Sequence, residues 1–487
     1  MNFNLVEMYN GLLRFNKHIL NELAEGLKHL PNLDGVSKGD SLIINEQGNP
    51  AWGSAAFIPT FENAAYGIEW TKDDNDIIRI GNAKFHRELP IQNRLKGCVY
   101  NEKKISYFLN PTGWAKPLEN GLIPPLDGSD GDVGVRVPEF YICVKDTGTK
   151  YQLWISDFNI DGTFTRVHPF IISHTKTMTR TREDGKEEVF SACIKHDDTR
   201  YLGGNKSSSS VVATKLQGRP RTGINYDKAN EFCANRGDWI TMIDYLEYCA
   251  IQALCYIEYA NFDNQAALNT NLTSDGFKQG GLGAGVTNLA WDRWTAFNGN
   301  NPIVQTYWTA EHNIGNGSTN GDHYELGNYN TDGSNLNTYP AVYRGILNFF
   351  GDIWTFIRDV VIVNRNANYK SVYLLKKGVN HADITIDNIQ DKCYFIGDQA
   401  NSNNFITEFD FRFGPYFIPN KVGTNKKADY NWIRGNNGQD TDKAVRVLRL
   451  GGGAHNGSAA GSGYFDSAWV RSDSDASVGF FTTVKLD

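Results

Sequence analysis

The sequence predicts an α+β protein with an N-terminal helix, a β-rich connector domain and a C-terminal domain that carries long ordered loops. Three observations indicate this class: apolar residues at helical spacing near the N-terminus, short apolar segments separated by turns up to about residue 165, and two further helical patterns followed by Asn- and Gly-rich segments. We therefore divide the 487 residues into an attachment segment (1–50), a connector (51–165) and a ligand-binding domain (166–487).

The N-terminal helix is predicted because apolar residues recur every three or four positions from Leu5 to Leu30, just before Pro31. With fewer than about four clean heptads, the helix either packs on its own domain or forms a short coiled coil that joins copies of the chain. We expect a homo-oligomer, and analogy with fibres favours a trimer. Residues 41–52 then predict a strand followed by a Gly-Asn-Pro turn.

The connector is predicted to consist of short strands. Asp76–Ile80 and Tyr151–Ile155 are typical strand segments, and Val133, Val135 and Val137 alternate as a half-buried strand requires. Carboxylates in the loop 124–132 could bind calcium, although their spacing does not match an EF-hand loop and a solvated turn is the alternative.

The C-terminal domain is predicted to open with helices over Asn225–Arg236 and Thr241–Ala260. Residues 262–340, which include Trp291, Trp294 and Trp308, are too aromatic for disorder and too irregular for a sheet. We expect long ordered surface loops there, and loops of that size usually serve a site.

Composition excludes several classes of partner. The formal net charge is −7 and no long basic run occurs, so we expect no nucleic-acid partner. No apolar stretch approaches about 18 residues and no signal-peptide pattern occurs, so we expect no membrane insertion and synthesis in the host cytoplasm without export. Aromatic residues at 13% and 48 glycines are typical of extracellular or virion proteins. Seven cysteines without a C-x-x-C pair predict buried reduced thiols.

Catalytic chemistry has no visible motif. The ten histidines are scattered, and no metalloprotease, hydrolase or nucleotide-binding motif occurs, so we predict no catalytic residue, no metal and no cofactor. Asp197 and Asp198 could serve acid–base chemistry or form an exposed turn. Arg236-Gly237-Asp238 spells an adhesion tripeptide but also suits a turn that leads into a helix.

Three segments of the second half carry a family pattern: Arg236–Glu247, Tyr343–Trp354, and Arg446–Gly452 with Val478–Phe480. In order and spacing they resemble the formylglycine-generating-enzyme-like branch of the C-type lectin fold over about residues 170–487. Four upstream segments resemble the region before this domain in phage and prophage tail proteins of gut bacteria: Tyr66–Trp70, Arg79–Asn82, Leu89–Gln92 and Leu109–Pro111. The resemblance implies a C-type-lectin fold for the C-terminal domain.

Two departures from this family narrow the function that it implies. The last cysteine is Cys393, before the terminal segment, whereas the enzymes of the branch use cysteines near the C-terminus. The calcium and sugar triplets of C-type lectins are also missing. What is left is similarity to the variable proteins of diversity-generating retroelements, in which adenine-directed mutagenesis rewrites codons inside a fixed frame, here Arg446–Gly452 and Val478–Phe480.

Adenine-directed exchange in AAC-type codons never yields Lys, Glu, Gln, Met or Trp. The segment 451–480 contains no Lys, Glu, Gln or Met, and Trp469 is the one exception, which would be fixed or come from another codon. An ordinary Gly- and Ser-rich loop is the alternative. The candidate contact residues are Ala454, His455, Ser458, Ala459, Ser462, Tyr464, Asp466, Ser467, Trp469 and Arg471. Tyr464, Trp469 and Arg471 are the expected anchors.

The expected function is that of a phage tail receptor-binding protein, an adhesin of the tail fibre or tail tip. Its partners would be a host-cell surface protein or glycan and other tail proteins of the virion. The alternatives are a virion-associated glycan-degrading enzyme, with the aromatic loops at 291–308 as sugar platforms, and a purely structural tail component.

Overall fold

The computed structural model describes residues 40–44, 50–54, 58–72, 76–195, 201–202, 218–286, 304–317, 340–424, 429–435 and 441–486. The chain divides into two compact units, Met1–Thr60 and Phe61–Asp487. In the first unit, β1 (Asp40–Ile44) and β2 (Pro50–Ser54) form an antiparallel hairpin, so the strand predicted after Ser41 is present. The helix predicted from Leu5 to Leu30 lies outside the described residues.

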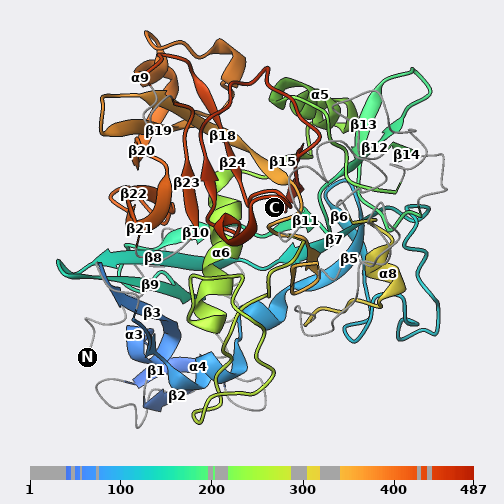
Figure 1. Cartoon of the computed structure of the whole chain (residues 1–487). Coiled ribbons are helices and arrows are strands. Elements are labelled where there is room, and N and C mark those ends of the chain that lie inside the picture. Colours follow the sequence, from blue (N-terminus) through green and yellow to red (C-terminus); the bar gives the residue numbers. More distant parts are fainter. Residues whose placement is uncertain are drawn as a thin grey trace, which may run out of the picture. The chain divides into compact units, whose positions relative to one another are not determined.

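The predicted α+β class, with its C-type-lectin fold, is wrong because the protein is mostly β. Strand (35%) outweighs helix (15%) more than twofold, and several sheets fill the second unit (Figure 1). Many of the strands are only two to five residues long and pair with segments far away in the sequence. Such short strands do not carry the extended period-two pattern by which a strand is predicted.

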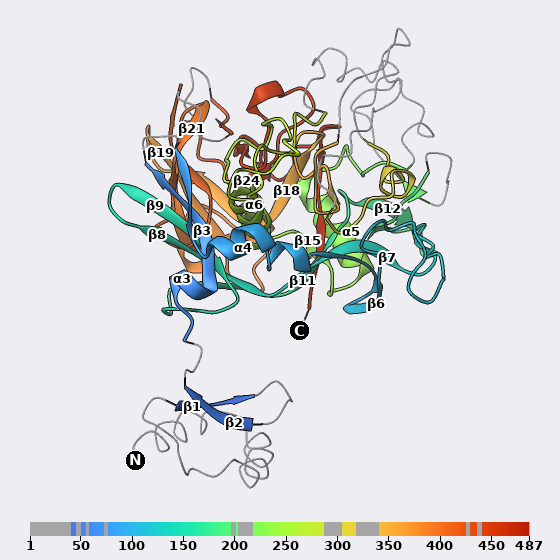
Figure 2. The same cartoon turned by 90° about the horizontal axis from the view of Figure 1, so that it is seen from below.

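Helix α6 (Tyr245–Tyr259) lies in the middle of the second unit in both views (Figures 1 and 2). All its residues except Leu246 are buried, as expected for a helix that is apolar all round. A capping box starts it, because Asp244 accepts the backbone N–H of Glu247 and Glu247 accepts that of Asp244. The helix begins later than predicted because Thr241–Met242 form strand β15.

Two sheets join residues of the predicted connector and of the predicted C-terminal domain. The six-stranded sheet has the order β15, β27 (Thr482–Lys485), β11 (Phe170–Ser173), β7 (Asp132–Val137), β5 (Lys96–Asn101) and β6 (Lys104–Phe108). The five-stranded sheet has the order β10 (Thr165–Val167), β8 (Phe140–Asp146), β9 (Lys150–Ser156), β3 (Ala65–Thr71) and β4 (Ile77–Gly81). The three alternating valines of β7 are buried on one face, as predicted, but Asp132 and Gly134 on the other face are buried too, so this strand is not half-buried.

The third large sheet carries the C-terminal segment. Its order is β20 (Cys393–Ala400), β19 (Tyr369–Leu375), β18 (Trp354–Asn364), β24 (Arg446–Leu450), β25 (Phe465–Asp466), β23 (Tyr430–Trp432), β21 (Asn404–Asp410) and β22 (Ile418–Gly423), with β26 (Val478–Gly479) also paired to β18. The sheet curls until β22 contacts β20, which makes it nearly a barrel.

The other described elements are smaller. The strands are β12 (Met178–Thr181), β13 (Glu187–Phe190), β14 (Tyr201–Leu202), β16 (Val342–Tyr343) and β17 (Ile346–Leu347). The α-helices are α3 (Phe61–Ala64), α4 (Ala83–Glu88), α5 (Tyr226–Arg236), α8 (Trp308–Glu311) and α9 (Ile389–Lys392), and the 3-10 turns are Gln92–Arg94, His381–Asp383 and Gly457–Ala459. Helix α5 confirms the helix predicted over Asn225–Arg236, with Asn225 as its N-cap.

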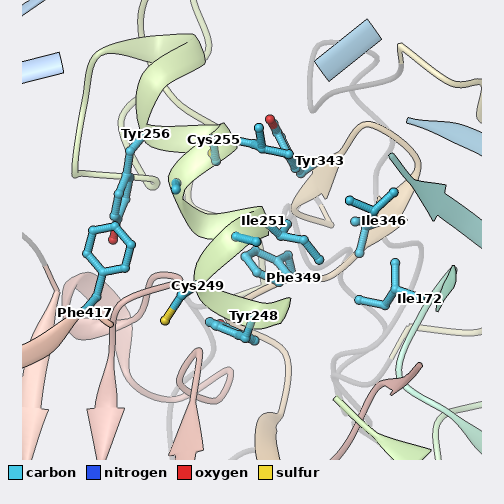
Figure 3. Packing of buried hydrophobic residues seen from close by; sticks show 14 of the residues in the cluster. Ile172, Tyr248, Cys249, Ile251, Cys255, Tyr256, Tyr343, Ile346, Phe349 and Phe417 are labelled. Carbon is cyan, nitrogen blue, oxygen red and sulfur yellow. The ribbon is translucent and has the colours of Figure 1, made fainter. Parts of the chain in front are cut away.

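The core is continuous around α6. Figure 3 shows Phe417 on one side of the helix and Ile172 and Ile346 on the other, and the rings of Tyr248 and Phe349 stack at 4.6 Å. The same cluster includes side chains from β3, β7 and β9, so the border predicted at residue 165 runs through one shared core. The chain is long enough to bury this much apolar surface without a disulfide.

Further predictions concern the cysteines, the tryptophans of residues 262–340, and Asp197 and Asp198. All seven cysteines are buried and free, which confirms the reduced thiols. Trp308 is buried, and its ring stacks on His312 at 4.5 Å. Trp291, Trp294, Asp197 and Asp198 lie outside the described residues.

Candidate ligand-binding site

The C-terminal segment starts and ends on one strand. β24 pairs antiparallel with β18 at Thr355 and Leu450, and β26 pairs parallel with β18 at Trp354 and Val478. Because Trp354 and Thr355 are consecutive, both ends of the segment 451–477 are fixed at the same place. These frame residues are buried, so the frame acts as scaffold.

Half of the ten contact candidates face the interior: Ala454, Ser462, Tyr464, Asp466 and Ser467. Tyr464, one of the three expected anchors, is only 3% exposed. Its ring packs against Trp354 at 4.5 Å and against Tyr430 at 5.7 Å. This corrects the sequence-based expectation for these five residues, which offer no side chain to a partner in this conformation.

The other five candidates reach the surface in two places. His455, Ser458 and Ala459 lie at the turn Gly457–Ala459, and Trp469 and Arg471 lie further along the chain. Burial lowers the pKa of His455 to about 4, so this imidazole is neutral near pH 7. Ser458 is the most open of the group.

Trp469 lies over a row of side chains that crosses four strands. The register aligns Trp432 on β23 with Asp466 on β25, Asp466 with Arg449 on β24, and Arg449 with Phe356 on β18. The ring centroid of Trp469 lies 3.5 Å from the guanidinium carbon of Arg449 and 6.2 Å from the ring of Phe356. Trp469 thus covers the middle of the row.

Arg449 is fixed from several sides. Its side chain is 5% exposed, and its Nη2 donates to the carboxylate of Asp466, which is 1% exposed. The ring of Trp354 lies 4.9 Å from the same guanidinium, on which Trp469 also lies. A buried cation in contact with two indole rings is a favourable arrangement, and it restricts the movement of Trp469.

Trp469 also borders an open pocket. The pocket has a volume of about 380 Å³ and is lined by Arg434, Ala468, Trp469, Asp473 and Ser474; we call it the Trp469 pocket. Nη1 of Arg434 lies 4.0 Å from Oδ2 of Asp473, and both side chains are partly exposed. The pocket therefore combines an aromatic ring with a balanced pair of charges.

Trp432 and Arg434 escaped the sequence-based prediction. Trp432 is 43% exposed and Arg434 is exposed, whereas Asn431 and Ile433 are buried. Residues two apart along an extended chain point to the same side, so Trp432 and Arg434 share the outer face. This alternation was the available signal, but it lies outside the segment 451–480.

A larger pocket of about 850 Å³ opens beside Arg471, between α5 and the start of α6. Nη1 of Arg471 lies 2.7 Å from Oδ2 of Asp227 on α5. Burial and the neighbouring Asp244 raise the pKa of Asp359 to about 6. Oδ1 of Asp359 accepts the backbone N–H of Tyr245 at 2.9 Å, and Asp244 caps the same helix, so both carboxylates serve the start of α6.

The described residues support neither calcium binding by the loop 124–132 nor adhesion through Arg236-Gly237-Asp238. Within the described ranges, no group of three His, Cys, Asp or Glu side chains is placed to hold a metal ion. In the loop 124–132, Asp127 accepts the N–H of Ser129 within its own turn. Arg236 is paired with Asp132 at 2.7 Å and with Glu188 at 2.9 Å, so the tripeptide forms a structural turn.

No protein-family model matches the chain, and no curated protein matches it. Of the helices in the described part of the chain, none has the length and apolar character needed to cross a membrane. The functional assignment therefore rests on the geometry of the site and on the patterns in the sequence.

Proposed function

We propose that the chain is a phage tail receptor-binding protein that holds a host-cell surface component without covalent chemistry. The proposed contact surface consists of residues 468–475 together with Trp432 and Arg434; we call it the Trp469 surface. The observation that carries the proposal is the placement of Trp469, an aromatic side chain fixed over Arg449 beside an open pocket. Rigid aromatic anchors lose little conformational entropy on binding and supply large contact areas.

The sequence supports the viral setting. The upstream segments resemble phage and prophage tail proteins, and the segment 451–480 lacks four of the five residue types that adenine-directed exchange in AAC-type codons does not produce, the fifth being present once, as Trp469. In this proposal the protein belongs to the tail fibre or tail tip, contacts other tail proteins and forms a homo-oligomer, with a trimer favoured. Several copies on one virion would strengthen binding by weak single sites.

The frame suits a surface whose residues are exchanged. Both ends of the segment are fixed on β18, and its buried side chains, such as Tyr464 and Asp466, pack under the surface. Exchange at exposed positions such as Ser458, Ser472 and Ser474 leaves this packing unchanged. Binding loops commonly vary in this way: the scaffold stays rigid while exposed residues of the loop are replaced.

The glycan-degrading alternative expected the aromatic residues of the loops at 291–308 to bind sugar. Trp308 is only 6% exposed, so its ring offers no surface on which a sugar could lie. Trp291 and Trp294 lie outside the described residues.

The test is binding of the full-length chain to whole cells. Fluorescently labelled protein is incubated with a panel of gut bacterial isolates and measured by flow cytometry. We expect binding to a subset of isolates and a loss of at least about tenfold in affinity for Trp469→Ala, because hot-spot aromatics commonly contribute this much. Phe158→Ala, which removes a ring that is 42% exposed from the loop after β9, is the control. Binding to no isolate, or binding that Trp469→Ala does not change, contradicts the proposal and leaves the purely structural role.

A further inference from the structure

We infer that the Trp469 pocket binds a neutral saccharide unit of a surface glycan. This inference rests on the proposed function and names the ligand class of the same site. It is carried by the indole of Trp469 and the balanced Arg434–Asp473 charge pair, which line a small open pocket, and by the exposed indole of Trp432 two residues before Arg434.

The aromatic part of the site is the indole of Trp469, which lines the pocket, while the indole of Trp432 lies outside the lining residues. Trp432 stands at the open end of the row whose middle Trp469 covers, with Asp466 and Arg449 between them. Trp432 is 43% exposed, whereas Asp466 and Arg449 are buried. The indole faces carry negative partial charge, and the C–H groups of a pyranose ring carry positive partial charge. A sugar ring can therefore lie on either indole without needing a deep apolar hole.

The polar part of the site suits hydroxyl groups. Arg434 offers N–H donors, the carboxylate of Asp473 accepts, and Ser474 can do both. Arg434 and Asp473 lie 4.0 Å apart, so their charges offset each other at the pocket. This balance favours a neutral sugar over an acidic one, because an anion would have to displace Asp473 from Arg434.

The size of the pocket favours a glycan over a protein loop. Its volume of about 380 Å³ lies near the lower end of the range for small-molecule sites. Protein hot spots instead fill well-packed pockets that exclude water, and this pocket is open and half polar. A few placed polar groups on an aromatic surface are what fix the orientation of a small polar ligand.

The site divides into a constant and an exchangeable part. Trp432 and Arg434 precede the segment 451–480 and Trp469 is its residue that adenine-directed exchange does not produce, so these three are the constant part, whereas Asp473 and Ser474 are the exchangeable part. Exchange within the segment would change which hydroxyl pattern fits, while Trp432 and Arg434 keep the ring-stacking and donor groups. One fold could then follow a host that alters its surface sugars.

The test uses an isolate that the full-length chain binds. Cells are treated with sodium periodate, which cleaves vicinal diols of sugars, or with proteinase K, which removes surface proteins. We expect periodate to abolish binding and proteinase K to leave it within about twofold. Purified surface polysaccharide from the same isolate should compete with the cells.

Amino-acid substitutions show which side chains the saccharide contacts. Trp432→Tyr keeps a flat aromatic face and should keep binding within about threefold, whereas Trp432→Leu keeps apolar volume and should lose at least about tenfold. Arg434→Ala should also lose at least about tenfold, and Phe158→Ala should change nothing. Binding that proteinase K abolishes and periodate spares, or equal binding by Trp432→Leu and Trp432→Tyr, overturns the saccharide inference while the receptor-binding function stands. If no isolate is bound at all, the proposed function itself fails.

Discussion

Asp466→Asn distinguishes a scaffold role for this residue from a contact role. Asp466 and Arg449 form a buried pair beneath Trp469, with side chains 1% and 5% exposed. Asparagine keeps nearly the same shape and can still accept the backbone N–H of Ala468, which Asp466 accepts at 2.7 Å. The substitution therefore removes the negative charge and little else, and leaves a buried guanidinium without its carboxylate.

We expect Asp466→Asn to lower the free energy of unfolding strongly. Removing one partner from a buried ion pair costs about 3–5 kcal/mol, because the other charge stays desolvated. Total stabilities are commonly only about 5–15 kcal/mol, so the variant should be clearly less stable. Since Trp469 rests on Arg449, its fixed packing should loosen as well.

Urea unfolding followed by far-UV circular dichroism measures the loss as a lower midpoint with an unchanged slope. The double variant Arg449→Met, Asp466→Leu replaces both charges by apolar side chains. We expect it to lose less than either single change, since a buried pair replaced as a whole costs little.

Two outcomes would refute this reasoning. A loss below about 1 kcal/mol for Asp466→Asn would mean that water reaches the pair, as for exposed ion pairs. Unchanged stability with lost cell binding would make Asp466 a contact residue, as the sequence alone suggested.

Three further predictions concern other parts of the chain. Arg471→Ala should change stability by less than about 1 kcal/mol in urea unfolding, because its pair with Asp227 is exposed on both sides; a larger loss would show that the pair is structural. Burial and the neighbouring Asp244 raise the pKa of Glu247 from 4.5 to about 8, so its proton stabilises the fold fully below about pH 4.5 and this contribution is lost as the pH rises through about 8. Glu247→Gln should therefore flatten the unfolding midpoint between about pH 5 and pH 8, and an unchanged slope with pH would contradict the assignment. Finally, a thiol reagent such as DTNB should label none of the seven cysteines in the native protein and all seven in guanidinium chloride, because each is buried and free; native labelling would show that a thiol is open.

The sequence predicts the helices better than the fold class. Helices α5 and α6 have caps and apolar periodicity within one short stretch, so local information suffices for their existence. The strands depend on partners far away: β27 at the C-terminus pairs with β11, where Phe170 faces Lys485. A strand of four residues with such a partner has no local signature, which is why the strand content was underestimated.

Of the proposed Trp469 surface, the sequence indicated Trp469 and Arg471 but not Trp432 or Arg434. The pattern of missing residue types indicates which positions can change but not which side they face, so Tyr464 and Asp466 were expected at the surface although both are buried. Trp469 was expected as an anchor, and its packing on Arg449 becomes visible only in the structure, through the register of β24 and β25 and the contact of the ring with the guanidinium. Trp432 was missed because β23 reaches the site through pairing with β25.

Hydroxyl-radical footprinting of the full-length chain, free and bound to cell-surface material from an isolate that it recognises, tests the central claim most directly. We predict protection concentrated at residues 432–434 and 468–475, with little change at Phe158 or Tyr394, which are exposed elsewhere. Protection centred on another surface, with Trp432 and Trp469 as reactive in the bound chain as in the free one, would contradict the account.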